Sequence, residues 1–306
     1  MLGMKREVNM EWVDKMNAAL NYIEDNLTEN IDFEEVARRA CCSSYNFQRM
    51  FSFITDTSLA EYIRRRRMSV AALDLQKSDA KVIDVAMKYG YESPISFSRA
   101  FSKVHGITPK DAKKSGAALK IYPKISFQIS IKGEIPMNYR IETKPAFDVF
   151  GIETVASLSG NKKYTSPAQL WQKSHRNGDY EKLFEASGDL PDFLPQDLCK
   201  IHGVENYRKT FGNTYSYMLC AFVSENSKTK GYKIRHIPSQ TYAIFPSERF
   251  KWDETFGVLE NLQKRFYSEW LPTAKYERID GPNFEIYGGD REYGYIELWY
   301  PVKSTE

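Results

Sequence analysis

The sequence predicts two domains: an all-α double helix-turn-helix, followed by an α+β domain of two βαββ repeats with an antiparallel sheet and its helices on one face. Three observations predict this architecture. The chain has 306 residues, enough for two domains of ordinary size. Apolar residues recur at helical spacing up to about residue 115 and alternate with polar residues after it. Each half also contains a motif that occurs twice.

Composition excludes several classes of protein. A net charge of +3 does not by itself indicate nucleic-acid binding, so any basic surface must be local. We find no run of about 18 apolar residues and no apolar signal segment, so we expect a cytoplasmic protein without a membrane partner. Cys41, Cys42, Cys199 and Cys220 lack CxxC spacing and the four histidines are scattered, which favours reduced thiols, no metal and no cofactor.

The first helix-turn-helix is predicted within residues 31–51, IDFEEVARRACCSSYNFQRMF. Asp32 followed by Glu35 is the pattern of a capping box that opens a short helix. After a turn of about four residues, Ser43 and Ser44 cap a second short helix. Two short helices joined by such a turn form a helix-turn-helix.

The same motif recurs fifty residues later. DVAMKYGYESPISFSRAF again predicts a short helix, a turn, and a second helix with Ser93 as N-cap and Pro94 as its first residue. FQRMF and FSRAF superimpose as Phe-x-Arg-x-Phe. The two phenylalanines of each copy lie four residues apart and are expected to face the core. Arg49 and Arg99 are therefore predicted to face outward.

A long helix, SLAEYIRRRRMSVAALDLQ at residues 58–76, is predicted to join the two motifs. Two second helices held about 34 Å apart would enter successive major grooves on one face of DNA. The alternative is a plain helical bundle with solvated arginines, which two copies in one frame disfavour. The run Arg64–Arg67 wraps around its helix, so phosphate contact, internal ion pairs and a solvated face all stay open for it.

With these motifs and GITPKDAKK, the sequence resembles the AraC/XylS DNA-binding domain, which we place at residues 8–115. The resemblance implies double-stranded promoter DNA as a partner, with each second helix in a major groove. Tyr45 and Ile95 depart from the residues of some relatives, so base preferences do not transfer. The implied contacts are to bases from Tyr45, Asn46, Gln48, Arg49, Ile95, Ser96 and Arg99, and to phosphates from Ser44, Ser98 and Lys103.

A boundary is predicted at DAKKSGAALK, residues 111–120, where the composition becomes rich in Gly, Ser and Lys. After it the hydrophobic period changes from 3.6 to 2, as in KISFQISI. We therefore expect the second domain to occupy residues 120–306.

The second half repeats itself. YRIETKPAFDVFGI and YKIRHIPSQTYAIF align at an offset of 93, each as a strand, a kink at Pro and another strand. Helices are expected at about residues 166–186 and 253–269, each followed by two strands. YSYMLCAFV and YGYIELWYPV also align as the last strand of each copy. Two such units are expected to pair into one antiparallel sheet, with the opposite face left for a partner or ligand.

A glutamate in the last strand is the candidate for chemistry. Strand alternation places these residues on one face, away from the helices: Tyr293, Tyr295, Glu297 and Trp299. A carboxylate among rings can hold an organic cation through charge and cation–π attraction. When the two repeats are aligned, Leu219 occupies the position in the first copy that Glu297 occupies in the second. An apolar residue is therefore accepted there, and the fold does not require an acid. The alternatives are an ion pair with a base such as Lys233 or Arg235, or an exposed edge position.

Over about residues 120–306 the sequence resembles the GyrI-like (gyrase-inhibitor-like) effector-binding domain, on the double repeat, Leu170-Trp171 and IELWYPVK. The resemblance implies a groove for amphipathic, often cationic or aromatic, small molecules, with Glu297 as its carboxylate. Trp171 is either a groove wall or part of the helix core. The expected ligand-binding residues are Glu297, Tyr295, Trp299, Tyr293, Trp171 and Tyr217.

Together the two resemblances predict a transcription regulator that binds promoter DNA and whose activity a small effector modulates. Activation is the expected direction, and repression stays open as the alternative. RNA polymerase is expected as a further partner. Two alternatives stay open for the second domain: a hydrolase of reactive small molecules, with the pocket glutamate as general base, and a protein-interaction module. No Ser/His/Asp set supports other chemistry, so we expect no enzyme and assign no catalytic residue.

Overall fold

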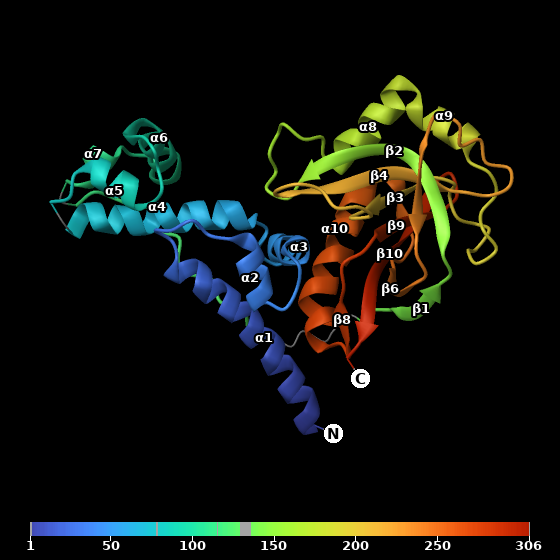
Figure 1. Ribbon diagram of the computed structural model, residues 1–306, viewed down its shortest axis with the longest axis horizontal. Coiled ribbons are helices and arrows are strands. Elements are labelled where there is room, and N and C mark those ends of the chain that lie inside the picture. Colours follow the sequence, from blue (N-terminus) through green and yellow to red (C-terminus); the bar gives the residue numbers. More distant parts are fainter. Residues whose placement is uncertain (1, 78, 115, 129–135, 306) are drawn as a thin grey trace. The chain divides into compact units, whose positions relative to one another are not determined.

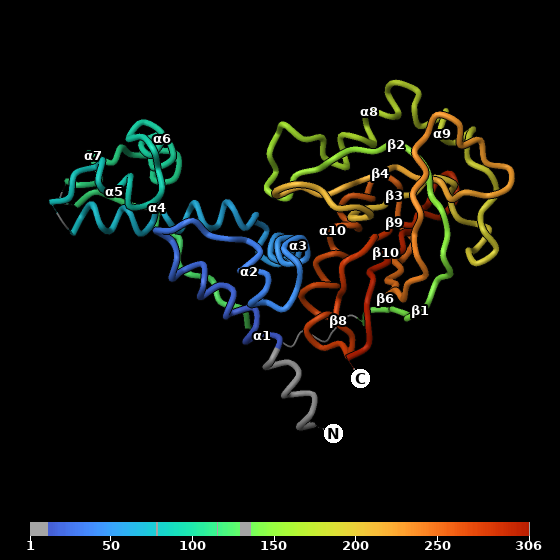
Figure 2. Tube along the Cα trace, viewed as in Figure 1, coloured from blue at the N-terminus to red at the C-terminus, as the bar shows by residue number. Residues whose placement is uncertain are grey.

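A computed structural model describes residues 2–77, 79–114, 116–128 and 136–305, with side chains from Trp12 onward. Figure 1 presents it as a ribbon, and Figure 2 follows the same chain as a tube. The first part is helical and the second holds an antiparallel sheet with helices, as the two periodicities predict. Within these residues, no helix is long and apolar enough to cross a membrane.

Contacts divide the chain into two compact units. The helical unit comprises Met1–Phe47 and Thr57–Ser130, and the sheet unit comprises Gln48–Asp56 and Ile131–Glu306. The division passes through one helix, so that its second part is grouped with the sheet.

The predicted N-caps determine where the short helices of the first part begin. The helices before residue 115 are α1 Leu2–Asp25, α2 Phe33–Arg39, α3 Ser44–Thr55, α4 Leu59–Lys77, α5 Val82–Lys88, α6 Pro94–His105 and α7 Pro109–Ala112. The side chains of Asp32, Ser43 and Ser93 each accept a backbone N–H of the helix that follows. Glu35 differs from the predicted capping box, because its carboxylate pairs with Arg39 one turn later.

Two aromatic pairs and a run of arginines hold the helices together. Phe47, Phe51, Phe97 and Phe101 are at most 1% exposed, which confirms the core-facing half of each repeated motif. The arginine run makes internal contacts. Arg64 and Arg65 pair with a glutamate one turn earlier on α4. Arg66 pairs at 2.7 Å with Glu24 of α1, and Arg67 donates at 2.8 Å to a main-chain carbonyl just beyond α1. Of the three roles left open, internal pairing is the one observed.

The segment after α7 stays with the helices instead of starting the sheet. The backbone N–H of Tyr122 donates to Ser69 of α4 at 2.9 Å. The side-chain amide of Asn17 on α1 exchanges two hydrogen bonds with the backbone of Phe127, at 2.8 and 3.0 Å. The expected strand KISFQISI is therefore not a strand over residues 124–128, and its remainder lies outside the described residues. Apolar and polar residues alternate in this segment because it is extended and packs one of its two sides on the helices.

The sheet unit contains the two predicted βαββ repeats. The first comprises β1 Arg140–Lys144, β2 Phe147–Ser157, α8 Pro167–Asn177, α9 Asp179–Ala186, β3 His202–Glu205 and β4 Thr214–Phe222. The second comprises β5 Lys233–Ile237, β6 Gln240–Pro246, β7 Phe250–Lys251, α10 Thr255–Arg265 with its continuation η2 Phe266–Trp270, β8 Tyr276–Arg278, β9 Asn283–Gly289 and β10 Tyr293–Ser304.

The two repeats interlock in one antiparallel sheet of order β1-β6-β10-β9-β3-β4-β2-β5, with β7 and β8 paired to β10. The first strand of each repeat crosses to the edge of the other, because β1 pairs with β6 and β5 pairs with β2. The order is symmetric about the β3–β9 pair, so strands of both repeats meet at its centre. Figure 1 shows this curved sheet with its helices.

Both helices cover the same face of the sheet, as predicted. Trp171 of α8 contacts Tyr287 of β9 edge to face, and Phe266 after α10 stacks on Tyr300 of β10 at 3.8 Å. The strand register places Tyr287 and Tyr300 on one face of the sheet. The opposite face is not open for a ligand as expected. Its apolar residues form a buried cluster onto which Leu194 and Leu198, from the segment after α9, pack.

Candidate functional site

The glutamate singled out from the sequence is neutralised within the chain. The Glu297 carboxylate pairs with Arg140 of β1 at 2.9 Å and accepts the Nε1–H of Trp299 at 3.0 Å. Trp299 is 1% exposed and belongs to the apolar cluster of that face. The internal ion pair was one of the alternatives, but the base is Arg140 rather than Lys233 or Arg235. The structure therefore contradicts the expectation that Glu297 is a pocket carboxylate awaiting a cation.

The sequence repeat was aligned one residue out of step for the last strands. Leu219 pairs with Gly203 of β3, and Gly203 pairs with Glu285 of β9, whose neighbour on β10 is Leu298. Leu219 therefore lies on the helix face with Leu298, whereas Glu297 lies on the opposite face. Because side chains alternate with period two, a slip of one residue exchanges the two faces. The comparison of Leu219 with Glu297 was wrong for this reason.

A different carboxylate lies at the centre of the helix face. Glu285 of β9 is 6% exposed, and its Oε2 accepts the hydroxyl hydrogens of Tyr217 at 2.8 Å and Tyr287 at 3.0 Å. The Tyr217 oxygen in turn accepts the Nε1–H of Trp171 at 2.9 Å. Within the described residues, no Lys, Arg or His nitrogen lies within 4.0 Å of the Glu285 carboxylate. The direct partners of this buried acid are thus two hydroxyls, and the positive charge of Arg49 acts on it only from beyond 4.0 Å.

Burial makes the proton affinity of this carboxyl unusual. Loss of water raises the pKa of Glu285 to about 7, and the negative charge of nearby Glu205 adds to the effect. The two tyrosine hydroxyls act in the opposite direction, because they donate to the ionised form. Burial also raises the pKa of both Tyr217 and Tyr287 well above the ordinary value, so these hydroxyls stay donors. The site is therefore poised to exchange a proton near neutral pH.

Two neighbours on β3 complete the surroundings of Glu285. Glu205 is 4% exposed and accepts the side-chain N–H of Asn283 at 3.2 Å. Gly203 lies directly across from Glu285, and a Cβ built there would fall 2.5 Å from the Glu285 Oε2 and 2.6 Å from the Tyr217 hydroxyl oxygen. Because Gly203 has no side chain, the Glu285 carboxyl and the Tyr217 hydroxyl can form their hydrogen bond at the centre of the sheet.

Only part of the expected ligand set comes together at this site. Trp171 and Tyr217 belong to it, because the indole of Trp171, on α8, donates to the Tyr217 hydroxyl. Tyr295 and Trp299 lie with Glu297 on the opposite face, and Tyr293 is 37% exposed at the start of β10. Glu285 and Tyr287 were missed. The strand NFEIYGG carried the same signal as IELWY, an acid that alternates with an aromatic residue.

The second helix-turn-helix presents an open face. Ile95 of α6 is 67% exposed, and Ser96, Arg99 and Lys103 are exposed too, whereas Ser98 is half-buried. The hydroxyl of Ser96 is shared with the helix cap, where it donates to the Ser93 carbonyl at 2.8 Å. α6 thus combines a buried Phe side with an outward basic side, as its sequence pattern predicts.

The corresponding face of α3 is covered. Tyr45, Asn46 and Gln48 are at most 9% exposed, and Ser44 is half-buried. Within the sheet unit, to which Gln48–Asp56 is assigned, Arg49 pairs with Glu205 at 3.0 Å. The outward orientation expected for Arg49 is therefore not the one observed.

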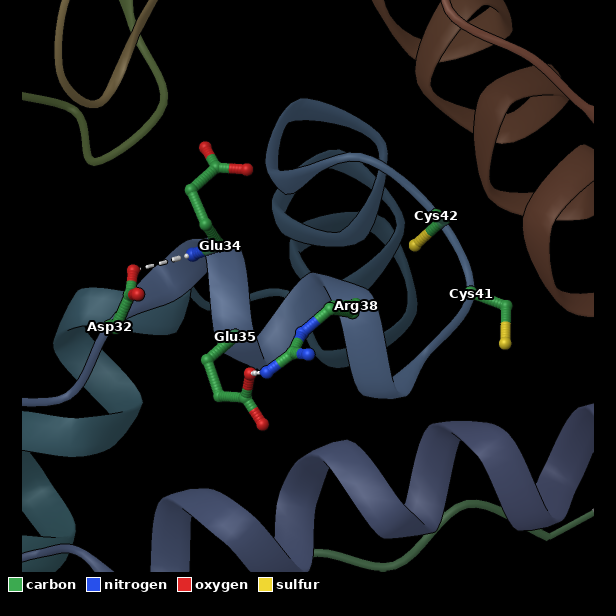
Figure 3. A pocket seen from close by; sticks show the side chains of 6 residues that line it. All are labelled: Asp32, Glu34, Glu35, Arg38, Cys41 and Cys42. Atoms are coloured by element: carbon green, nitrogen blue, oxygen red, sulfur yellow. Dashed lines mark hydrogen bonds and ion pairs between the residues drawn. The ribbon is translucent and has the colours of Figure 1, made fainter.

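An open hollow of about 560 Å³ lies beside α2 in the helical unit. Its lining is polar and consists of Asp32, Glu34, Glu35, Arg38, Cys41 and Cys42. Figure 3 shows the sulfur of Cys41 directed away from Arg38, whose guanidinium is paired with Glu35. Asp32 thus caps the helix, and Glu35 forms ion pairs. In the described part of the chain, no group of three or more potential ligands could hold a metal ion.

Comparisons with known proteins match two separate parts of the chain. Residues 140–302 match the family described as integron-associated effector binding protein, and residues 36–115 match a helix-turn-helix domain. The transcriptional activator AarP of Providencia stuartii is 40% identical over 90 residues, which cover 29% of this chain and 67% of AarP. Regulatory protein SoxS of Salmonella typhimurium is 35% identical over 92 residues, 30% of this chain and 86% of SoxS.

Among solved structures, that of SAV2435 bound to tetraphenylphosphonium is similar over 55% of this chain and 94% of SAV2435. The two share 20% sequence identity with a TM-score of 0.41.

Proposed function

Because the chain belongs to the AraC-type helix-turn-helix regulators and, over residues 140–302, to the integron-associated effector binding family, we propose that a small lipophilic cation controls its action on promoter DNA. DNA-binding regulation of transcription by a chain with an effector-binding domain is the premise. The relatives over the helical unit are regulators, so the chain is a regulator and not an enzyme. The class of ligand and the site that holds it are the proposal.

One observation carries the ligand class: Glu285 is a buried carboxyl without a basic partner among the described residues. An ionised acid in an apolar interior is destabilising unless a positive charge compensates it. Tyr217 and Tyr287 donate their hydroxyls to it, and Trp171 donates to Tyr217, so three rings of the kind that attract organic cations lie near the carboxyl. A metal ion suits the site poorly, because aromatic rings supply few oxygen ligands.

Trp171 of α8 is half-exposed, and its indole N–H donates to Tyr217, whose hydroxyl donates to the Glu285 carboxylate. We assign Trp171 the role of a movable wall that a flat aromatic ligand replaces by stacking. A ligand that displaces it must compensate the bond from the indole N–H to Tyr217, a net contribution of about 1 kcal/mol.

The ligand proposal is tested by thermal unfolding of the full chain with a matched pair of ions. Tetraphenylphosphonium and tetraphenylborate have the same shape and opposite charge. We expect the cation to raise the unfolding temperature and the anion to leave it unchanged, and we expect Glu285→Gln to abolish the difference. Glu297→Gln is the matched control and keeps the response. Equal stabilisation by both ions would refute a charge-selective site.

For DNA, we propose that α6 reads bases through Arg99 and Ile95, with phosphate contacts from Ser98 and Lys103. For α3 the same proposal requires its face to be open in the complex. The exposed basic side of α6 supports the assignment. RNA polymerase as a further partner is proposed on the activating role of relatives such as AarP.

The DNA proposal is tested with a duplex that the chain itself selects from a random library. We expect Arg99→Ala to weaken binding by about 1–3 kcal/mol, or roughly 5- to 150-fold, and to relax the preference at one position. Arg64→Ala, an exposed arginine already paired on α4, is the control and stays near wild type. If both variants bind like wild type, α6 is not the reading helix.

A further inference from the structure

Two loops meet at one end of the sheet unit. Residues 158–166 connect β2 to α8, and residues 206–213 connect β3 to β4. β2 and β4 pair as far as Ser157 and Thr214, and the Leu158 N–H then donates to the Asn213 carbonyl at 3.0 Å. The two loops, which we call the loop pair, therefore lie side by side where these strands end (Figure 1).

All charged residues of the loop pair are basic. Its sequences, LSGNKKYTS and NYRKTFGN, contain four basic residues and no Asp or Glu. Lys162, Lys163 and Lys209 are exposed, and no carboxylate among the described residues lies within 4.0 Å of their amines. Arg208 is the exception, because it reaches Glu153 of β2 at 3.9 Å. Three unpaired positive charges thus converge on one tip of a chain whose net charge is only +3.

Two aromatic residues are exposed among these charges. Phe211 is 96% exposed and Tyr164 is 40% exposed. A phenylalanine left in water at a loop tip gains nothing from the fold, and rings interleaved with lysines are typical of surfaces that contact nucleic acid. The charge and the rings therefore indicate the same kind of partner.

We propose that the loop pair binds the phosphate backbone of double-stranded DNA that flanks the site held by the helix-turn-helix motifs. The inference goes beyond the proposed function and rests on its DNA-binding half. Lysine amines suit phosphate as point charges, and they contact the backbone without reading sequence. Phe211 supplies an apolar contact to the sugars or a groove wall.

The covalent chain limits how far the sheet unit can lie from such DNA. Phe127 is fixed to α1 by two hydrogen bonds, and β1 begins at Arg140. The twelve residues between them reach about 40 Å at most. When the helix-turn-helix motifs hold DNA, flanking duplex is therefore presented to the sheet unit at an effective concentration in the millimolar range. Even weak phosphate contacts add measurably to affinity under these conditions.

The test compares two duplexes that carry the same selected site. One ends at the site, and the other extends it by about three helical turns on each side. The variant replaces Lys162, Lys163 and Lys209 by Ala in the full chain. The matched control replaces three exposed lysines elsewhere in the sheet unit by Ala, two of them in the loop at the opposite end of β4: Lys173, Lys228 and Lys230.

We expect the extended duplex to bind wild type more tightly, with a plot of log affinity against log salt that is steeper by about 2 to 3 units. The loop-pair variant loses both the gain and the extra slope, and it binds the short duplex like wild type. The control variant keeps both. Absence of any gain from the flanks, or an equal loss in the control, overturns the proposal.

A lipid surface is the other anionic partner that the loop pair would suit. Vesicles of phosphatidylglycerol and phosphatidylcholine test it by co-sedimentation with the full chain. Vesicle binding that depends on the three lysines, together with an unchanged salt slope on DNA, replaces the DNA proposal by a membrane one. Failure of wild type to prefer any sequence, in contrast, removes the proposed function itself and not only the role of the loop pair.

Discussion

Replacement of Glu285 by Gln removes one charge from the centre of the sheet unit, and its effect on stability can be worked out from the structure. Burial raises the pKa of this carboxyl from 4.5 to about 7 in the folded chain. The difference between 4.5 and 7 is about 2.5 pKa units, which corresponds to about 3 kcal/mol of folding free energy at ~1.36 kcal/mol per unit. The Gln amide has nearly the same shape and can still accept from Tyr217 or Tyr287.

The sign of the effect follows from which state binds the proton. Below pH 4.5 the carboxyl is protonated in both states, so it contributes nothing to the pH dependence. Between pH 4.5 and 7 the unfolded chain has lost the proton while the folded chain keeps it, so the free energy of unfolding falls as pH rises. Above pH 7 the full penalty is present and constant. The Gln variant lacks this penalty at every pH.

We therefore expect Glu285→Gln to match wild type near pH 4.5 and to exceed it by about 3 kcal/mol at pH 8. Urea unfolding of both proteins from pH 4.5 to 8.5 measures this, followed by Trp fluorescence, since four of the five tryptophans lie in the sheet unit. Glu181→Gln, on the exposed surface of α9, is the control and shows no such trend. A Gln variant that is less stable at pH 8, or a difference that does not change with pH, refutes the reasoning.

Three further substitutions test other contacts by urea unfolding. Arg66→Ala removes the ion-pair partner of Glu24, whose side chain is 9% exposed, and should destabilise the helical unit by about 3 kcal/mol. Arg64→Ala breaks a half-buried pair within one turn of α4 and changes stability by less than about 1 kcal/mol. Asn17→Ala removes two hydrogen bonds to the segment after α7 and should cost about 1–3 kcal/mol; a null effect would mean that this segment does not stabilise the helices. Gly203→Ala forces a methyl group against the carboxyl site and should cost about 1–3 kcal/mol and weaken cation binding, while Gly257→Ala on α10 meets no atom within 4 Å and is neutral or stabilising.

Local signals predicted the helical half well because they act over a few residues. The caps at Asp32, Ser43 and Ser93 and the paired phenylalanines depend only on neighbours two to four positions away. The order of elements in the sheet unit was predictable for the same reason, since a kink at Pro and a change of period mark each boundary. The contacts of Arg66 and Arg67 on α4 were not predictable, because their partners on α1 and just beyond it lie about forty residues away.

The site was only half predictable because strand pairing is not local. An acid within an apolar strand is a good indicator of an unusual carboxyl, and both Glu285 and Glu297 satisfied it. Sequence cannot tell which of the two has a base across the sheet, because Arg140 reaches Glu297 from a strand of the other repeat. The alignment of the two repeats was also wrong by one residue, so it placed Leu219 on the same face of the sheet as Glu297. The strand register in the structure shows both which acid has a basic partner and which face each residue occupies.

The acid at Glu285 lowers stability at neutral pH by about 3 kcal/mol relative to an amide of the same shape, so its presence is better explained by binding than by folding. A cation needs the ionised form, and below pH 7 it must compete with the proton. The affinity for tetraphenylphosphonium should therefore fall about tenfold per pH unit below 7 and stay constant above it. Binding should also release one proton per cation near pH 6, which calorimetry in two buffers of different ionisation enthalpy measures. Affinity that is independent of pH from 5.5 to 8.5, with no proton released, would mean that the cation does not pair with this carboxyl.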